Sequence, residues 1–254
     1  MPLTAWTPIL ALVIACALHA DPPPDLIKRI VARETETAQA QANYTYRQTL
    51  TIEEFDDHNV PTGRYREIRD VVFTPKGART EEFVGKPDKT LKRLILTDED
   101  FRDVREVQPF LMTAEQAFLY ETRFKGEETM DGVECWVVQI QPRQLLSGQR
   151  LFEGMLWVSQ ADYSILRSEG QAVPQIHSTK SENLFPHFTT IRKKIAGGLW
   201  FPVVTFADDT LYFRTGPQRI RMTIRYAAYK KFGADSKITF EPPAEPPRSD
   251  FRIE

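Results

Sequence analysis

The stretch "EGMLWVSQADYSILRSEG", residues 153–170, decides how the fold of this chain is interpreted. Apolar residues in 155–158 and 163–166 flank the polar tetrapeptide "SQAD", a pattern typical of a β-hairpin. A half-buried strand alternates apolar and polar residues, because successive side chains point to opposite faces of the sheet. Residues 155–158 are apolar without interruption. We therefore expect the first strand of this hairpin to be covered on both faces.

Other segments divide into the same two kinds of strand. The segments "CWVVQI" (135–140) and "LWFPVVTF" (199–206) carry apolar residues on both faces. The segment "RIRMTIRY" (219–226) instead alternates, with Ile220, Met222, Ile224 and Tyr226 on one face and polar residues on the other. The pattern predicts outer strands with one hydrated face and central strands with none.

Helical signals are few. Residues 26–43 predict an amphipathic helix, with Leu26 and Ile30 at i, i+4 spacing. Residues 97–107 begin with a capping pattern, Thr97 followed by Asp100, and residues 109–120 predict one or two further helical turns. The remainder predicts about ten antiparallel strands. We expect one mainly β (α+β) domain over residues 26–240, a single strongly curved antiparallel sheet forming an open, incomplete barrel with helices against its concave face.

The termini carry different signals. Residues 1–20 contain no Lys, Arg, Asp or Glu, and the apolar run at 9–18 is too short to span a bilayer, as in a secretory signal peptide. Cleavage after Ala20 would release a soluble exported protein. Alternatively, "VIAC" resembles a lipobox, which would leave residues 1–15 as the signal and Cys16 lipidated. Residues 21–25 read as a Pro-rich spacer, and residues 241–254 as a disordered tail.

Composition argues against several classes of protein. A formal charge of −2, from 33 basic and 35 acidic residues, argues against nucleic-acid binding. Without residues 1–20 only Cys135 remains, and its apolar surroundings predict a buried structural thiol. His177, Glu182 and His187 lie close in sequence, but in a polar loop without regular ligand spacing. Since the chain also lacks nucleotide-binding and hydrolase motifs, we expect no enzyme activity, metal or cofactor.

In their order along the chain, the segments "GVECWVVQIQP", "FEGMLWVSQADYSILRSEG" and "GGLWFPVV" resemble the LolA-like superfamily of periplasmic lipoprotein-sorting proteins. The characteristic pieces are Leu156, Trp157, Val158 and Asp162 in the hairpin and the later "WFP" strand. The resemblance implies an open barrel that binds acyl chains between sheet and helices, in the periplasm or at the outer membrane when anchored through Cys16. In carriers of this family an arginine on a strand tethers the helices, and the sequence does not identify the equivalent residue here.

Two functional hypotheses follow. The first is a monomeric protein that binds lipid or lipoprotein acyl chains in an apolar cavity lined by Trp136, Val138, Ile140, Leu156, Val158, Phe201 and Val203. The second is an envelope interaction or regulatory module whose barrel is plugged by its own helices. The stripe Arg219, Arg221 and Arg225 is either a solvated strand face or a contact for anionic head groups at a membrane surface, and Arg192, Lys193 and Lys194 add to the second reading.

Overall fold

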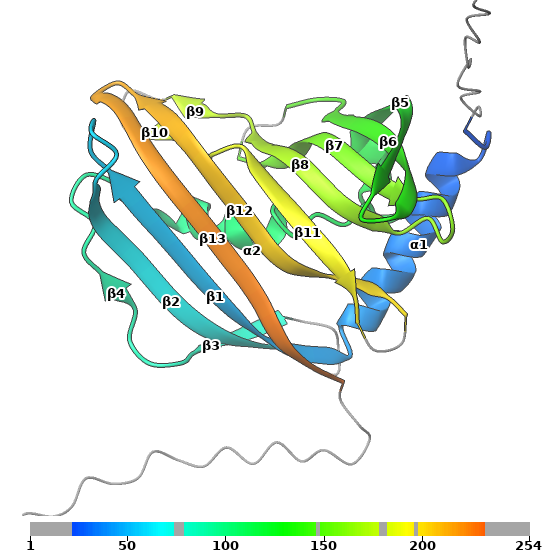
Figure 1. The fold of residues 1–254 in the computed structure, drawn as a ribbon, viewed down its shortest axis with the longest axis horizontal. Coiled ribbons are helices and arrows are strands. Elements are labelled where there is room, and N and C mark those ends of the chain that lie inside the picture. The colour runs from blue at the N-terminus through cyan, green and yellow to red at the C-terminus, as the bar shows by residue number, and fades with distance from the viewer. Residues whose placement is uncertain (1–21, 74–78, 146–147, 178–181, 196–197, 232–254) are drawn as a thin grey trace, which may run out of the picture.

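The fold is built on one large antiparallel sheet that does not close (Figure 1). The computed structural model describes residues 22–73, 79–145, 148–177, 182–195 and 198–231. The proposed signal peptide, Cys16 and the 241–254 tail lie outside these residues. The sheet runs in the order β3-β2-β1-β13-β12-β11-β8-β7-β6-β5, and β4 also pairs with β2. The expected single, open antiparallel sheet is confirmed.

The strands of one half of the sheet are β1 (Tyr44–Phe55), β2 (Pro61–Phe73), β3 (Arg79–Phe83), β4 (Asp88–Lys89), β11 (Phe188–Lys194), β12 (Trp200–Phe213) and β13 (Gly216–Lys231). The other half contains β5 (Tyr120–Met130), β6 (Val133–Pro142), β7 (Leu151–Ser159) and β8 (Ile165–Val173). A separate two-stranded ladder joins β9 (Ile176–His177) to β10 (Glu182–Asn183).

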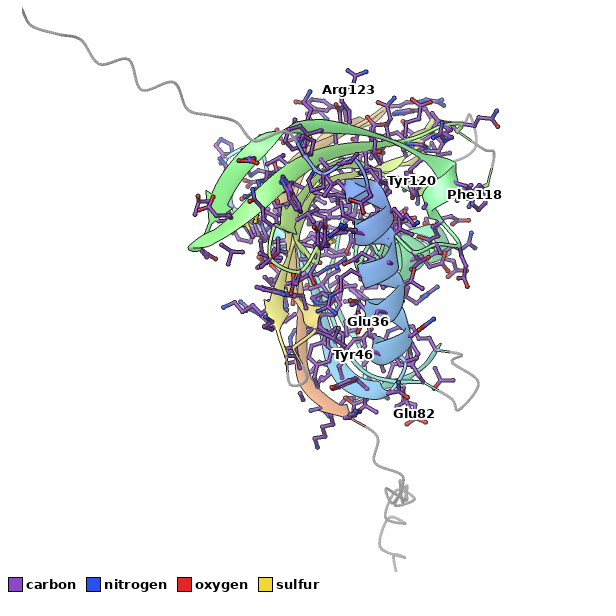
Figure 2. All side chains as sticks on the ribbon, turned by 90° about the vertical axis from the view of Figure 1, so that its right-hand side faces the viewer. Glu36, Tyr46, Glu82, Phe118, Tyr120 and Arg123 are labelled. Carbon is purple, nitrogen blue, oxygen red and sulfur yellow. The ribbon has the colours of Figure 1, made fainter. Side chains whose placement is uncertain are left out.

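Two helices and an irregular segment cover the concave face. Figure 2 shows α1 (Leu26–Gln41) lying along the hollow side of the sheet, with Glu36 and Tyr46 toward the same end. The second helix, α2 (Asp98–Glu106), starts with the expected capping box between Thr97 and Asp100. Between them, α1 and α2 place Ile30 and Val104 in the main apolar core. Among the described residues no helix is long and apolar enough to cross a membrane.

The hairpin of residues 153–170 is confirmed as β7 paired with β8. Leu156 and Val158 belong to the main core on the concave side. Trp157 points to the other face and forms a smaller cluster with Cys135, Val137 and Leu166. The Arg167 guanidinium lies 4.5 Å from the Trp157 ring centroid, and the indole N–H donates to Glu128 across 2.7 Å. The second face is therefore covered by side chains of neighbouring strands, without a helix.

The segment after α2 differs from the expectation of further helix. Only residues 117–119 form a turn of 3-10 helix, η1 (Ala117–Leu119). Residues 107–116 are irregular. The Gln108 carbonyl accepts a hydrogen bond from the Thr190 hydroxyl across 2.9 Å, and the Phe110 carbonyl accepts one from Arg192. Residues 107–116 are therefore held against the sheet through their backbone carbonyls. We call residues 91–119, including α2 and η1, the strap.

Candidate functional site

The concave face of the sheet is the largest apolar surface that the helices and the strap cover. On β13, Ile220, Met222 and Ile224 point inward, and their polar neighbours point outward, as the alternation predicted. On β1, Leu50 and Ile52 face the same side. In a curved sheet the inward side chains of neighbouring strands converge, so this face offers a continuous apolar surface beneath α2.

Arg192 connects three separate elements across this face. Its Nη1 donates to Glu34 Oε2 of α1 across 2.8 Å, and its Nη2 donates to the Phe110 carbonyl of the strap. The second Glu34 oxygen accepts from the backbone N–H of Ile165, 3.2 Å away, at the start of β8. The side chains of Arg192 and Glu34 are 1% and 0% exposed. Separating the pair would leave a buried charge without its partner, so the contact holds α1 and the strap against β11, although the Arg192 Nε has no partner among the described residues.

The placement of Arg192 corrects the sequence interpretation, which put it with Lys193 and Lys194 on a basic surface. On β11 the side chains of Phe188, Thr190 and Arg192 all point inward and are buried. The two-residue period starting at Phe188 is the sequence signal that predicts this. The run of three basic residues obscured it, because such a run is usually solvated.

A second polar contact anchors the start of the strap. The Glu54 carboxylate of β1 accepts hydrogen bonds from the backbone N–H groups of Lys92, Arg93 and Leu94, at 2.6, 3.0 and 2.9 Å. Burial opposes ionisation of Glu54, but these bonds outweigh it and hold its pKa below the usual value. Gly63 on β2 leaves room for this approach, because a Cβ there would lie 2.5 Å from the Thr90 carbonyl oxygen.

A third contact holds α2 itself. Arg150, which precedes β7, donates to Asp103 Oδ2 across 2.5 Å and to the Asn183 carbonyl across 2.6 Å. The Asn183 amide donates to Thr97 and Asp100 at the start of α2. Burial raises the pKa of Asp103 to about 6, although the nearby Arg150 charge lowers it. The charge on Asp103 therefore changes as the pH passes about 6.

The apolar space left beneath α2 is small. An apolar pocket of about 40 Å³ lies beneath α2, between the strap and strands β1, β12 and β13. Ligand pockets commonly hold roughly 300–1,000 Å³. A larger cleft of about 410 Å³ opens beside Arg150, but its lining is mainly polar, with Arg102, Glu106 and Glu115 among the lining residues. The apolar part of the concave face beneath α2 is therefore filled by the protein's own side chains.

The residues predicted to line a cavity lie away from the apolar pocket. Trp136, Val138, Ile140, Leu156 and Val158 share the concave side of β6 and β7, where they are buried in the main core. Phe201 is fully buried against the rings of Tyr44 and Tyr229, and Val203 is half-buried. None of the seven lines the 40 Å³ pocket. Their role in lipid binding stays a prediction.

The arginine stripe of β13 lies on the opposite, convex face. Arg219 and Arg221 both pair with Asp208, at 2.6 and 3.1 Å, and Arg225 is exposed. The stripe is therefore separated from the pocket by the thickness of the sheet. Its contact with lipid head groups stays a prediction, without a neighbouring cavity to support it.

Polar side chains considered for chemistry are dispersed. His177 Nδ1 lies 3.5 Å from Glu182, whereas His187 is on another segment and bonds through its backbone N–H to Asp209. Within the part of the chain that the structure describes, no three His, Cys, Asp or Glu side chains are placed to hold a metal ion. Cys135 is buried and free, and burial, with the nearby charge of Glu134, raises its pKa to about 11.

Comparisons with known proteins found similar folds. No protein-family model and no curated sequence matches the chain. A DUF1329 family protein from Desulfovibrio piger is 14% identical, with a TM-score of 0.41, over 85% of this chain and 96% of its own. A LolA superfamily protein from Nitrosomonas europaea is 14% identical, with a TM-score of 0.35, over 80% and 94%. An outer membrane lipoprotein-sorting protein domain from Vibrio parahaemolyticus is 12% identical, with a TM-score of 0.39, over 82% and 94%.

Proposed function

We propose that this protein is an exported, non-enzymatic binding protein that takes up lipid or lipoprotein acyl chains on the concave face of its sheet. It acts in the periplasm after removal of residues 1–20, or at the outer membrane when anchored through Cys16. The observation that carries the proposal is the Arg192 contact. A single buried guanidinium ties both covering elements, α1 and the strap, to the sheet over an apolar surface.

The small free volume beneath α2 indicates how an acyl chain would have to enter. With about 40 Å³ free in this pocket, an acyl chain enters the space beneath α2 only when part of the cover moves. Movement of α1 and the strap would expose the inner side chains of β6 and β7, including Leu156 and Val158 of the predicted cavity lining. Burying an acyl chain there contributes about 0.8 kcal/mol per CH₂ group, which offsets the loss of protein contacts.

The test compares two matched double variants. Arg192→Leu with Glu34→Leu removes the buried contact, and Arg47→Leu with Asp70→Leu removes an exposed ion pair on β1 and β2. Each protein is purified from the periplasm of a bacterial host, and bound lipid is counted by native mass spectrometry and lipid extraction. We expect co-purifying lipid in the wild type and the surface variant, and a changed lipid occupancy only in the Arg192 and Glu34 variant.

A second function is favoured by the small volume of the pocket. If the cover never opens, the protein is an envelope interaction or regulatory module with a plugged barrel. A clean apo mass in all three proteins, with no uptake of added lipid, would support this function and remove the acyl-chain proposal. In that case, cross-linking in the intact periplasm identifies the protein partner.

A further inference from the structure

The apolar pocket beneath α2 continues into a second cavity at the end of the sheet where β12 turns into β13. This outer cavity has a volume of about 250 Å³. It shares Leu94, Ile95, Glu182 and Phe213 with the inner pocket, so the two spaces adjoin. We call the outer cavity the mouth. It lies on the β1, β12 and β13 half of the sheet, away from the predicted lining residues on β6 and β7.

The wall of the mouth is partly apolar, with Leu94, Ile95 and Phe213 among polar lining residues. The side chain of Ile95 is 79% exposed and leaves an apolar surface in water at the rim. Leu94 and Phe213 are half-buried beside it. Further in, Leu184, Leu211 and Ile220 form a buried apolar cluster that lines the inner pocket. Apolar side chains, with Glu182 beside them, therefore border both the mouth at the surface and the space beneath α2.

The charges at the mouth are unevenly balanced. Arg93 lines the mouth and is exposed. Its guanidinium donates to the Pro217 carbonyl across 3.4 Å and makes no ion pair within the described chain. Glu182, the other charged lining residue, already accepts the backbone N–H of Arg214 and lies 3.9 Å from its guanidinium. One cation thus remains available beside an apolar path.

We propose that the mouth binds a single-chain anionic amphiphile, with its acyl chain in the apolar path and its acidic head group at Arg93. The chain-binding part rests on the proposed function, and the site and the charge of the head group go beyond it. The chain fills the 250 Å³ mouth and extends inward as the exposed Ile95 side chain turns aside. A carboxylate or a phosphate monoester matches Arg93, because the guanidinium presents paired N–H donors to two oxygens.

The experiment measures binding of three probes to the purified protein by calorimetry below their micelle concentrations. The probes are dodecanoate, dodecyl phosphate and 1-dodecanol, which share one chain and differ in the head group. We expect both anions to bind more tightly than the alcohol. The substitution Arg93→Gln should weaken the binding of both anions about fivefold and leave the binding of the alcohol unchanged. The matched control is Arg225→Gln, an exposed arginine on the convex face, which leaves all three affinities unchanged.

A second pair of variants tests the chain path. The substitution Ile95→Ser should weaken the binding of all three probes. The control Val60→Ser changes an apolar residue in the β1–β2 turn that is 54% exposed, and it should weaken the binding of none. Both positions are exposed, so neither change removes core packing. If Arg93→Gln weakens the binding of dodecyl phosphate more than that of dodecanoate, the site prefers a phosphate head group. If it weakens the binding of dodecanoate more, the site prefers a fatty-acid carboxylate.

The experiments distinguish a failure of the mouth proposal from a failure of the proposed acyl-chain binding. If the probes bind and neither Arg93→Gln nor Ile95→Ser changes the affinity, the mouth is not the site, while acyl-chain binding elsewhere on the concave face stands. If no probe binds but lipid co-purifies with the protein, the mouth proposal is overturned and the broader function stands. If no probe binds and no lipid co-purifies, both are overturned.

Discussion

Arg192 on β11 and Glu34 on α1 form an ion pair of 2.8 Å that is completely enclosed by the protein. The two residues are 158 positions apart in the chain. Their contact places a helix from the start of the domain against a strand near its end, over an apolar sheet face. The Phe110 carbonyl of the strap accepts a hydrogen bond from the same guanidinium. One side chain therefore joins α1, the strap and β11.

Removing one partner of this pair should destabilise the protein strongly. Arg192→Leu leaves the Glu34 carboxylate buried without its cation, which costs about 3–5 kcal/mol. The double change Arg192→Leu with Glu34→Leu removes both charges and should recover most of that loss. Urea unfolding of the two single variants and the double variant measures the coupling. Additive losses in the double variant would show that the two side chains do not stabilise each other.

Asp103 should give the stability of the protein a distinct pH dependence. Its pKa is about 6 in the folded protein and 3.8 in its ordinary state. Between these values the folded protein binds more protons, so stability from this group is greatest in acid and is lost as pH rises through about 6. Against Asp103→Asn, the unfolding free energy of the wild type should fall by up to about 1.4 kcal/mol per pH unit across this range. Parallel pH curves for the two proteins would contradict the assignment.

Glu54 should hold the start of the strap in place. Glu54→Gln removes the charge that accepts three backbone N–H bonds, and we expect a loss of about 1–3 kcal/mol. The amides of Lys92, Arg93 and Leu94 should then exchange hydrogen faster. Glu53→Gln, at the neighbouring residue on the other face of β1, is the matched control. Equal exchange rates in both variants would mean that the strap is held elsewhere.

The thiol of Cys135 should be inert in the folded protein. It is fully buried and its pKa is raised to about 11, so little thiolate forms at pH 8. Iodoacetamide followed by peptide mapping should modify Cys135 only in denaturant. Rapid modification of the native protein would show that the small cluster around Trp157 opens to solvent.

Much of the fold follows from local patterns that the sequence displays. The hairpin at 153–170, the alternation of β13, the α1 helix and the Thr97 capping box were all predicted, because each depends on residues close together in the chain. The open antiparallel sheet follows from the number and spacing of the strands. The irregular part of the strap was not predicted, because its backbone carbonyls bond to side chains of β11, which are distant in sequence.

The site was less predictable for the same reason. Strand periodicity places Val138 and Leu156 on one face of their strands, but both faces are apolar, so the sequence did not identify which one is concave. However, which apolar positions border free space depends on how the strap packs over the sheet. The pocket accordingly lies beside Leu94 and Ile220, away from β6 and β7.

Side-chain periodicity and local capping were enough to predict the hairpin, the alternation of β13, the start of α2 and an open antiparallel sheet. The expectation that alternating strands lie at the outside of the sheet is wrong, because β13 pairs with both β1 and β12, while the apolar strand β6 lies next to the edge strand β5. Tertiary packing alone buries Arg192 with Glu34, pairs Arg219 and Arg221 with Asp208 on the convex face, and places the mouth at the β12–β13 end. Each of these depends on contacts between residues far apart in the chain, whose geometry is fixed only when the helices and strap pack against the curved sheet.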